Sequence, residues 1–218
     1  MQEPCRDLVT LTQVKPTQKG RLALFLDGEF AFSADLDTYA RYHLCTGQRY
    51  PIQLLEEVRQ ESGYQLAKEA AFRLLSYKSY TTAMLRQRLG RDYDPECVQR
   101  VLDRAEELGL LDDRDYALRL SRDLVRVKKW GLVRVEQELR RRGIGPQEVQ
   151  EALEQFEELD PEQRIAQVIN KKYRSALQDE KGCRRAVNGL LRLGYEYSDI
   201  SRVVQNLRED PDYYSDPQ

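Results

Sequence analysis

The chain has 218 residues, of which 33% are charged and 40% hydrophobic, and its formal net charge is −2 at pH 7. This length suits one or two ordinary domains or one array of small repeats. No run approaches the ~18 consecutive apolar residues of a membrane span, and the mild acidity excludes a domain that is basic throughout, so any nucleic-acid contact must be local.

The N-terminus and the cysteines indicate a cytoplasmic protein. Residues 1–5 have neither the basic start nor the apolar core of a secretory signal. The cysteines are scattered, at Cys5, Cys45, Cys97 and Cys183. This pattern argues against a zinc site or a disulfide framework and favours reduced thiols.

Short apolar runs at residues 8–15, 21–26 and 29–32 predict a small N-terminal sheet of three strands. Asp27-Gly28 lies between the last two runs. Because Asp and Gly tolerate the positive φ angles of a tight turn, this pair is a strong signal for a β-hairpin.

Two helices are predicted after the sheet. Asp35 is placed to cap a short helix that includes His43 and ends near Gly47. Pro51 then opens a second helix, which we expect to end at Gly63. Residues 1–63 therefore form an extension that precedes the rest of the fold.

One helix–turn–helix pattern recurs three times in the remaining chain. In each copy, two pairs of apolar residues spaced four apart flank a turn. These residues are Leu85, Leu89, Val98 and Leu102, then Val135, Leu139, Val149 and Leu153, then Val187, Leu191, Ile200 and Val204. A recurrence of roughly 50 residues is in the range of helical repeat proteins. An additional helix precedes each copy, at about residues 68–77, 113–129 and 162–177.

We therefore predict a mainly α fold of tandem three-helix repeats in an elongated, curved array, preceded by the small β element. The predicted repeats are residues 64–110, 111–158 and 159–208. Residues 209–218 are acidic and contain Pro without periodicity, which predicts a disordered tail.

The junction between the first two repeats is explained by local structure. Gly109 suits the left-handed position after a helix, and Leu111 can pack back onto that helix. Asp112 or Asp113 can then cap the next helix. The motif indicates a helix stop and a helix start rather than a binding site.

Positive charge is concentrated in the middle repeat, where the segment from Arg119 to Arg142 contains nine basic and three acidic residues. A helix C-terminus favours cations, but one packing role cannot account for all of Arg140-Arg141-Arg142. The local excess points to a polyanionic or acidic partner.

A second basic group in repeat three has two interpretations. It comprises Lys171, Lys172, Arg174, Lys181, Arg184 and Arg185. These residues either contact the same kind of partner or balance the acidic stretch at residues 148–162.

No residue pattern predicts catalysis. Trp130 either contacts a partner or fills the joint between helices. His43 is the only histidine and has no ligand or catalytic partner at helical spacing. The sequence also lacks a phosphate-binding loop, a nucleophile elbow and a metal-binding helix motif, so we predict neither enzyme activity nor a cofactor.

With these motifs identified, the chain resembles the RecX family of recombinase regulators over nearly all of its length. The family's junction motif is matched by Gly109-Leu110-Leu111-Asp112-Asp113 and Tyr116. Its second-repeat pattern is matched by Lys129-Trp130-Gly131, Val135, Glu138-Leu139, Arg141-Arg142 and Gly143-Ile144. Ser79 is similar to a serine before the second helix of the first repeat, and Leu26 to Phe30 resembles the extension of longer members. The chain departs from the family at Tyr77 to Tyr80, where many members have an arginine-rich turn, and at Trp130.

The resemblance implies a protein that binds RecA and RecA-coated single-stranded DNA, lies along the filament groove, and inhibits ATP hydrolysis and strand exchange. Such a role belongs to homologous recombination, DNA repair and the SOS response. Together with the charge pattern, it suggests contacts through Arg126, Lys128, Lys129, Trp130, Arg134, Arg140, Arg141, Arg142, Lys171, Lys172, Arg174, Arg184 and Arg185. We expect a monomer, since nothing in the sequence resembles a long exposed coiled-coil seam.

Two other functions are compatible with the residues alone. The arginines would allow an independent DNA-binding module, whose salt-dependent affinity the net acidity would keep weak. The repeat architecture would also allow a helical adaptor for a different protein partner.

Overall fold

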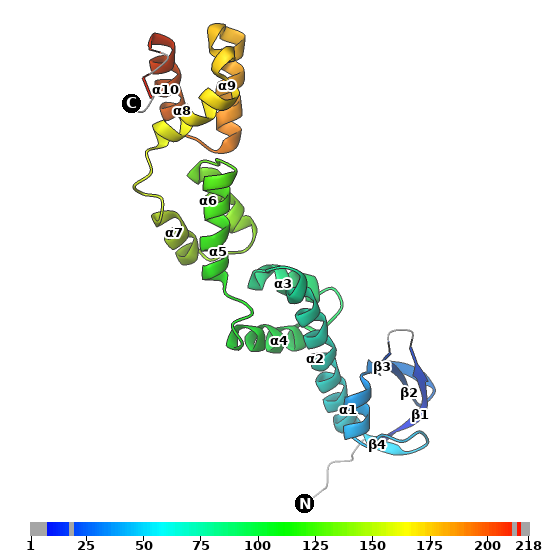
Figure 1. The fold of residues 1–218 in the computed structure, drawn as a ribbon. Coiled ribbons are helices and arrows are strands. Elements are labelled where there is room, and N and C mark those ends of the chain that lie inside the picture. Colours follow the sequence, from blue (N-terminus) through cyan, green and yellow to red (C-terminus); the bar gives the residue numbers. More distant parts are fainter. Residues whose placement is uncertain (1–7, 18–19, 211–212, 215–218) are drawn as a thin grey trace, which may run out of the picture. The chain divides into compact units, whose positions relative to one another are not determined.

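The computed structural model describes residues 8–17, 20–210 and 213–214, and it is mainly helical with a small N-terminal sheet (Figure 1). The chain divides into two compact units, Met1–Leu111 and Asp112–Gln218. Cys5 and most of the tail predicted to be disordered lie outside the described residues.

Unit one begins with an antiparallel sheet in the strand order β3-β2-β1-β4. Three strands match the predicted runs: β1 (Leu8–Pro16), β2 (Leu22–Leu26) and β3 (Glu29–Ala34). Asp27 and Gly28 both have positive φ, at 47° and 92°, as a tight hairpin between β2 and β3 requires. The backbone N–H of Thr10 donates to the Asp27 carboxylate at 3.0 Å, which ties the turn to β1.

The sheet has one strand more than predicted. β4 (Arg49–Pro51) pairs with the start of β1, where Val9 lies opposite Tyr50. The Tyr50 side chain is buried, and its hydroxyl accepts a hydrogen bond from the Cys45 N–H at 2.7 Å. Three residues are too few to show an alternating pattern, so this strand depends on contacts that are distant in sequence.

The first helix, α1 (Leu36–Arg41), is capped as predicted, since the Asp35 carboxylate accepts a hydrogen bond from the Thr38 N–H at 2.9 Å. The helix ends earlier than expected. His43 has a φ of 50° and lies in the following turn, so its placement on the helix was wrong.

The predicted helix end at Gly63 was also wrong, because α2 (Ile52–Tyr77) is one continuous helix. The boundary expected between residues 63 and 64 therefore falls inside a helix. A Cβ at Gly63 would lie 3.0 Å from the sulfur of Cys97, a residue of α4 (Pro95–Glu107) that packs against this position. Close packing of the two helices outweighs the cost of about 1 kcal/mol that Gly imposes within a helix.

Repeat one consists of the second half of α2, α3 (Thr82–Leu89) and α4 (Pro95–Glu107). The predicted apolar residues form its core, with Leu85, Leu89, Val98 and Leu102 all buried.

The junction that follows repeat one has the predicted structural roles. Gly109 adopts a φ of 66° and Leu111 is buried in the core of repeat one. The Asp112 carboxylate accepts a hydrogen bond from the Asp115 N–H at 2.8 Å and caps the next helix.

Repeat two begins unit two with α5 (Asp113–Arg122), which continues as a π-helical turn, η1 (Asp123–Val127). The sequence predicted the extent of this segment but not its π geometry. α6 (Leu132–Arg141) and α7 (Pro146–Glu154) complete the repeat. Its core contains Val135, Leu139, Ile144, Val149 and Phe156.

Repeat three contains α8 (Pro161–Lys172), a 3-10 turn η2 (Arg174–Gln178), α9 (Glu180–Leu193) and α10 (Tyr197–Glu209). The first helix ends five residues before the predicted residue 177, because the chain turns back to pack η2 against α9. Any Cβ at Gly182 of α9 would overlap the backbone of Ala176, so this contact requires glycine.

One residue of the predicted disordered tail is packed. Tyr214 lies against the core of repeat three, and its hydroxyl donates a hydrogen bond to the Glu162 carboxylate at 2.8 Å. Burial and this carboxylate raise the pKa of Tyr214 to about 12. The prediction of disorder was therefore wrong for Tyr214, whose aromatic ring finds an apolar surface that the local composition did not indicate.

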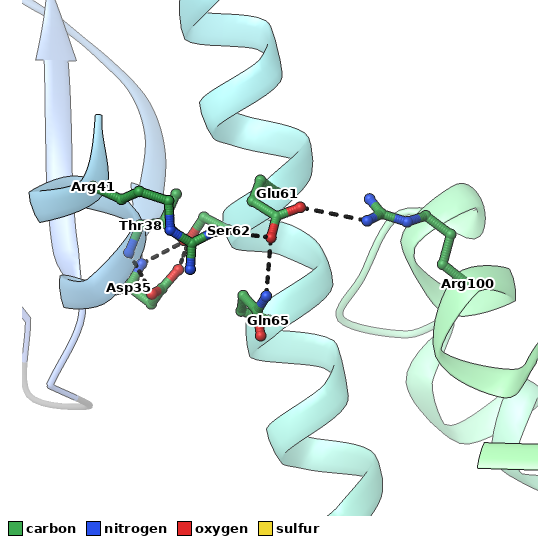
Figure 2. A network of polar contacts seen from close by, with 7 residues as sticks. All are labelled: Asp35, Thr38, Arg41, Glu61, Ser62, Gln65 and Arg100. Atoms are coloured by element: carbon green, nitrogen blue, oxygen red, sulfur yellow. Dashed lines mark hydrogen bonds and ion pairs between the residues drawn. The ribbon is translucent and has the colours of Figure 1, made fainter. Parts of the chain in front are cut away.

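A polar network fixes the sheet and its helix to repeat one (Figure 2). The fully buried hydroxyl of Ser62 accepts from the Asp35 N–H at 2.7 Å and donates to the Asp35 carboxylate at 2.7 Å. The neighbouring Glu61 forms ion pairs of 3.4 Å with Arg41 of α1 and with Arg100 of α4. α2 is therefore tied to an element on each side.

Replacing Ser62 with Ala should lower the free energy of unfolding by about 1–3 kcal/mol, because the Asp35 N–H and carboxylate both lose a buried partner. Urea unfolding followed by circular dichroism measures the effect. Ser76→Ala on the exposed end of α2 is the matched control and should change stability little. Equal unfolding midpoints for the two variants would contradict the role given to Ser62.

Candidate partner-binding surface

The three arginines at the end of α6 have different surroundings. Arg140 pairs with Glu136 at 2.6 Å, and Arg141 pairs with Glu138 at 2.8 Å. Both guanidinium groups remain largely exposed, with side chains that are 65% and 69% accessible. Arg142 is half-buried and bonds both Glu138 and the hydroxyl of Tyr116, which lies on α5.

Glu138 connects two of these arginines to the fold. Hydrogen bonds from Arg141 and then Arg142 outweigh the effect of burial and lower the pKa of Glu138 to about 2. Arg142 therefore holds α6 against α5 through Glu138 and Tyr116. Arg140 and Arg141 extend their charges outward at the helix C-terminus.

Trp130 and Arg134 lie in the joint between repeats two and three. The Arg134 guanidinium is 3.8 Å from the centroid of the half-buried Trp130 ring, and it donates to the Arg192 carbonyl at 2.6 Å. From repeat three, Arg164 donates to the Trp130 carbonyl at 2.7 Å. Of the two roles considered for Trp130, this geometry favours filling the joint.

Two glycines bring the backbones of these repeats into contact. The N–H of Gly131 donates to the Leu193 carbonyl at 2.7 Å, and a Cβ at Gly131 would overlap the backbone of Gly194. The Tyr195 hydroxyl donates to the Lys129 carbonyl at 3.0 Å. Sequence reasoning missed this joint because its partners are far apart in the chain.

The cations just before the joint are exposed. Arg126 is in η1, and Lys128 and Lys129 follow it, with Lys129 in the left-handed region at a φ of 56°. Lys128 places its ammonium 5.5 Å from the centroid of the Trp130 ring. Val127, between these cations, is 77% exposed.

The basic residues of repeat three lie on three elements, α8, η2 and α9. Lys171, Lys172 and Arg174 line a surface depression of about 400 Å³, together with neutral polar side chains. Arg184 and Arg185 lie exposed on α9, where Arg184 forms a 3.5 Å surface pair with Glu180. The structure therefore gathers Lys171, Lys172 and Arg174 around one depression and places Arg184 and Arg185 on the neighbouring α9.

Unit one contains a larger cavity, of about 770 Å³, that sequence reasoning did not find. Residues from the sheet loop, α1, α2 and α3 line it. In this lining Arg21 donates a hydrogen bond to the Tyr93 hydroxyl at 3.1 Å, and Arg88 forms an ion pair with Asp92 at 3.1 Å. The lining mixes cations and carboxylates, and many of these charges already have partners.

Within the described ranges, no cluster of three or more His, Cys, Asp or Glu side chains could hold a metal ion. Among the helices in those ranges, none is long and apolar enough to span a membrane.

Comparisons with protein families identify both central repeats. The model of the first three-helix domain of RecX matches residues 67–104, and that of the second matches residues 112–153. "Regulatory protein RecX" of Staphylococcus epidermidis is 27% identical over 201 residues, which cover 91% of this chain and 75% of the relative. Its counterpart in Staphylococcus aureus is 26% identical over 203 residues, with coverages of 91% and 74%.

Solved structures share the fold. A crystal structure of regulatory protein RecX aligns with a TM-score of 0.62 at 22% identity, covering 90% of this chain and 99% of that chain. RecX from Lactobacillus salivarius aligns with a TM-score of 0.58 at 19% identity, covering 67% and 97%.

Replacing Gly131 with Ala should lower the free energy of unfolding of unit two by about 1–3 kcal/mol, because the new methyl group must displace the Gly194 backbone. Gly145→Ala is the matched control, since Gly145 is also a helix N-cap with similar backbone angles and its Cβ would meet only the flexible Glu148 side chain. Thermal unfolding measures both changes. If the two variants have the same melting temperature, the close contact at Gly131 is not required for stability.

Glu138→Gln should destabilise the protein by about 1–3 kcal/mol at pH 7, because Arg141 and Arg142 lose an ionised acceptor. A carboxyl with a lowered pKa stabilises the fold when ionised, so this contribution is complete above about pH 4.5 and is lost as pH falls toward 2. Urea unfolding should show that the difference in the free energy of unfolding between wild type and variant becomes smaller from pH 7 to pH 3. Glu136→Gln, which removes only the exposed Arg140 pair, should cost less than about 1 kcal/mol. A gap that is constant with pH would exclude Glu138 as the titrating group.

Proposed function

The chain belongs to the RecX family, and on this premise we propose that it regulates RecA by binding RecA and its filaments on single-stranded DNA. Binding inhibits the filament's ATP hydrolysis and strand exchange. The protein has no catalytic activity of its own in this proposal. It acts in the cytoplasm as a monomer, in homologous recombination, DNA repair and the SOS response.

The exposed positive charge of the middle repeat is the observation that carries the proposal. Arg126, Lys128 and Lys129 lie at the end of η1, and Arg140 and Arg141 lie at the end of α6. A chain with a net charge of −2 presents these cations locally. Such a surface attracts an anionic partner, and a filament on DNA supplies both phosphates and protein carboxylates.

We infer different roles for the candidate residues from their surroundings. We infer that the five exposed cations make direct contacts. Trp130, Arg134 and Arg142 have intramolecular partners in the joint or between helices, so they position the contact residues. Lys171, Lys172, Arg174, Arg184 and Arg185 form a second, separate contact region on repeat three.

The function is tested by RecA ATP hydrolysis on single-stranded DNA, with this protein added before or after filament assembly. We expect inhibition at less than one molecule per RecA, because each bound molecule affects a polymer. Stronger inhibition on early addition would indicate a block to filament growth, and equal inhibition in both orders would indicate disassembly. No inhibition in either order, at equimolar protein and low salt, would refute the proposal.

Arg140→Ala/Arg141→Ala should weaken inhibition by roughly tenfold, because each removes an exposed contact charge. Surface ion pairs contribute about 0–1 kcal/mol to folding, so helical circular dichroism should be unchanged. The control is Arg86→Ala/Arg88→Ala, which removes two exposed arginines from the corresponding helix of repeat one. Equal losses in the two double variants would show that the effect is one of total charge, as expected for a weak DNA-binding module.

A further inference from the structure

The first two repeats share an exposed segment at the same place, where the first helix ends and the second begins. We call residues 77–81 elbow one and residues 127–131 elbow two. Elbow one connects α2 to α3, and elbow two connects η1 to α6. Elbow one lies in the first structural unit, with α2 and α3, and elbow two in the second, with α5 and α6 (Figure 1).

Each elbow begins with a large side chain that is exposed to solvent. Tyr77 is 83% exposed and Val127 is 77% exposed, and these are the highest values among the exposed large hydrophobic residues of the described chain. Neither side chain contributes to a core. A single exposed apolar residue is ordinary in a globular protein. Here, however, such a residue occurs at the same position of two repeats, which isolated exposure does not explain.

The next residues also correspond. In elbow one the Lys78 ammonium lies 4.7 Å from the centroid of the Tyr80 ring. In elbow two the Lys128 ammonium lies 5.5 Å from the centroid of the Trp130 ring. Both rings are half-buried, and a cation–π contact therefore holds each lysine, which directly follows the exposed apolar residue in the chain, against a ring of its own elbow.

The two backbones reach this arrangement by different paths. Lys78 is extended after an ordinary helix end. Elbow two instead follows a π turn and places Lys129 in the left-handed region. Hydrogen bonds from the Trp130 N–H to the Leu124 carbonyl at 2.9 Å, and from Tyr195 to Lys129, hold this conformation. Since the two helix ends have different backbone conformations, one common type of helix end does not explain the shared side-chain pattern.

The shared chemistry identifies the kind of partner. A nucleobase could stack on Tyr77 but not on Val127, which has no aromatic face. An apolar pocket on a protein accepts either side chain. The cations favour a pocket whose rim carries carboxylates. They are Lys78 in elbow one, Lys128 and Lys129 in elbow two, and Arg126 directly before elbow two.

We propose that the two elbows bind equivalent acid-rimmed apolar pockets on two subunits of one protein polymer. Two like contact points on one chain fit a partner that presents the same surface repeatedly. This inference rests on the proposed function, in which the polymer is the RecA filament. Joining two weak contacts in one chain raises the overall affinity, because the second contact forms at a high effective concentration.

Tyr77→Ser, Val127→Ser and the double variant test the proposal by sedimentation with RecA filaments on single-stranded DNA. Each single variant should bind at least tenfold more weakly, since it retains only one of the two apolar elbow contacts, and the double variant should lose still more. Both positions are exposed, so the variants should fold. Tyr197→Ser and Val133→Ser remove the same residue types at other exposed positions and should bind like wild type.

The outcomes separate this proposal from the one on which it rests. If wild type fails to bind RecA filaments, both are overturned. If wild type binds and the elbow variants bind like their controls, the elbow proposal alone is overturned. A parallel measurement uses bare single-stranded DNA. Equal weakening on bare DNA would replace the protein pocket with a nucleic-acid contact and would also overturn it.

Discussion

The packing of unit two depends on the absence of side chains at Gly131 and Gly194. A Cβ at either position would overlap the backbone on the other side of the joint. This close approach lets the Gly131 N–H reach the Leu193 carbonyl. It also lets the Arg134 guanidinium, which lies over the Trp130 ring of its own repeat, reach the carbonyl of Arg192. The contact fixes repeat three relative to the cations of repeat two.

Most of the fold follows from interactions that are local in sequence. Apolar residues spaced four apart predict the helical repeats, and the Asp27-Gly28 turn and the Asp112 cap can be predicted from adjacent residues. The missed features depend on distant contacts. β4 forms because Tyr50 pairs with Val9 of β1. α2 continues through Gly63 because Cys97 packs against this position. No periodicity in the sequence carries that information.

The candidate surface was predictable as a region but not residue by residue. Charge density identified the middle repeat, and the spacing of Glu138 and Arg142 by one helical turn could have identified that pair. The role of Arg134 in the joint could not be inferred, because the Arg192 carbonyl that accepts its hydrogen bond belongs to another repeat. Long-range backbone contacts thus decide which cations remain available to a partner.

The π turn at Asp123–Val127 lets its helix hold one residue more than regular α geometry would. A π turn accommodates one more residue than an α-helical path between the same end points. Deleting one residue within the turn would therefore restore regular α geometry and leave the later residues in phase, so that Trp130 would stay in the joint that holds Arg134 and Arg164. A deletion in the regular part of α5 would instead rotate every later residue by about 100° around the helix axis. The π turn is therefore the place in this helix where the loss of one residue is tolerated.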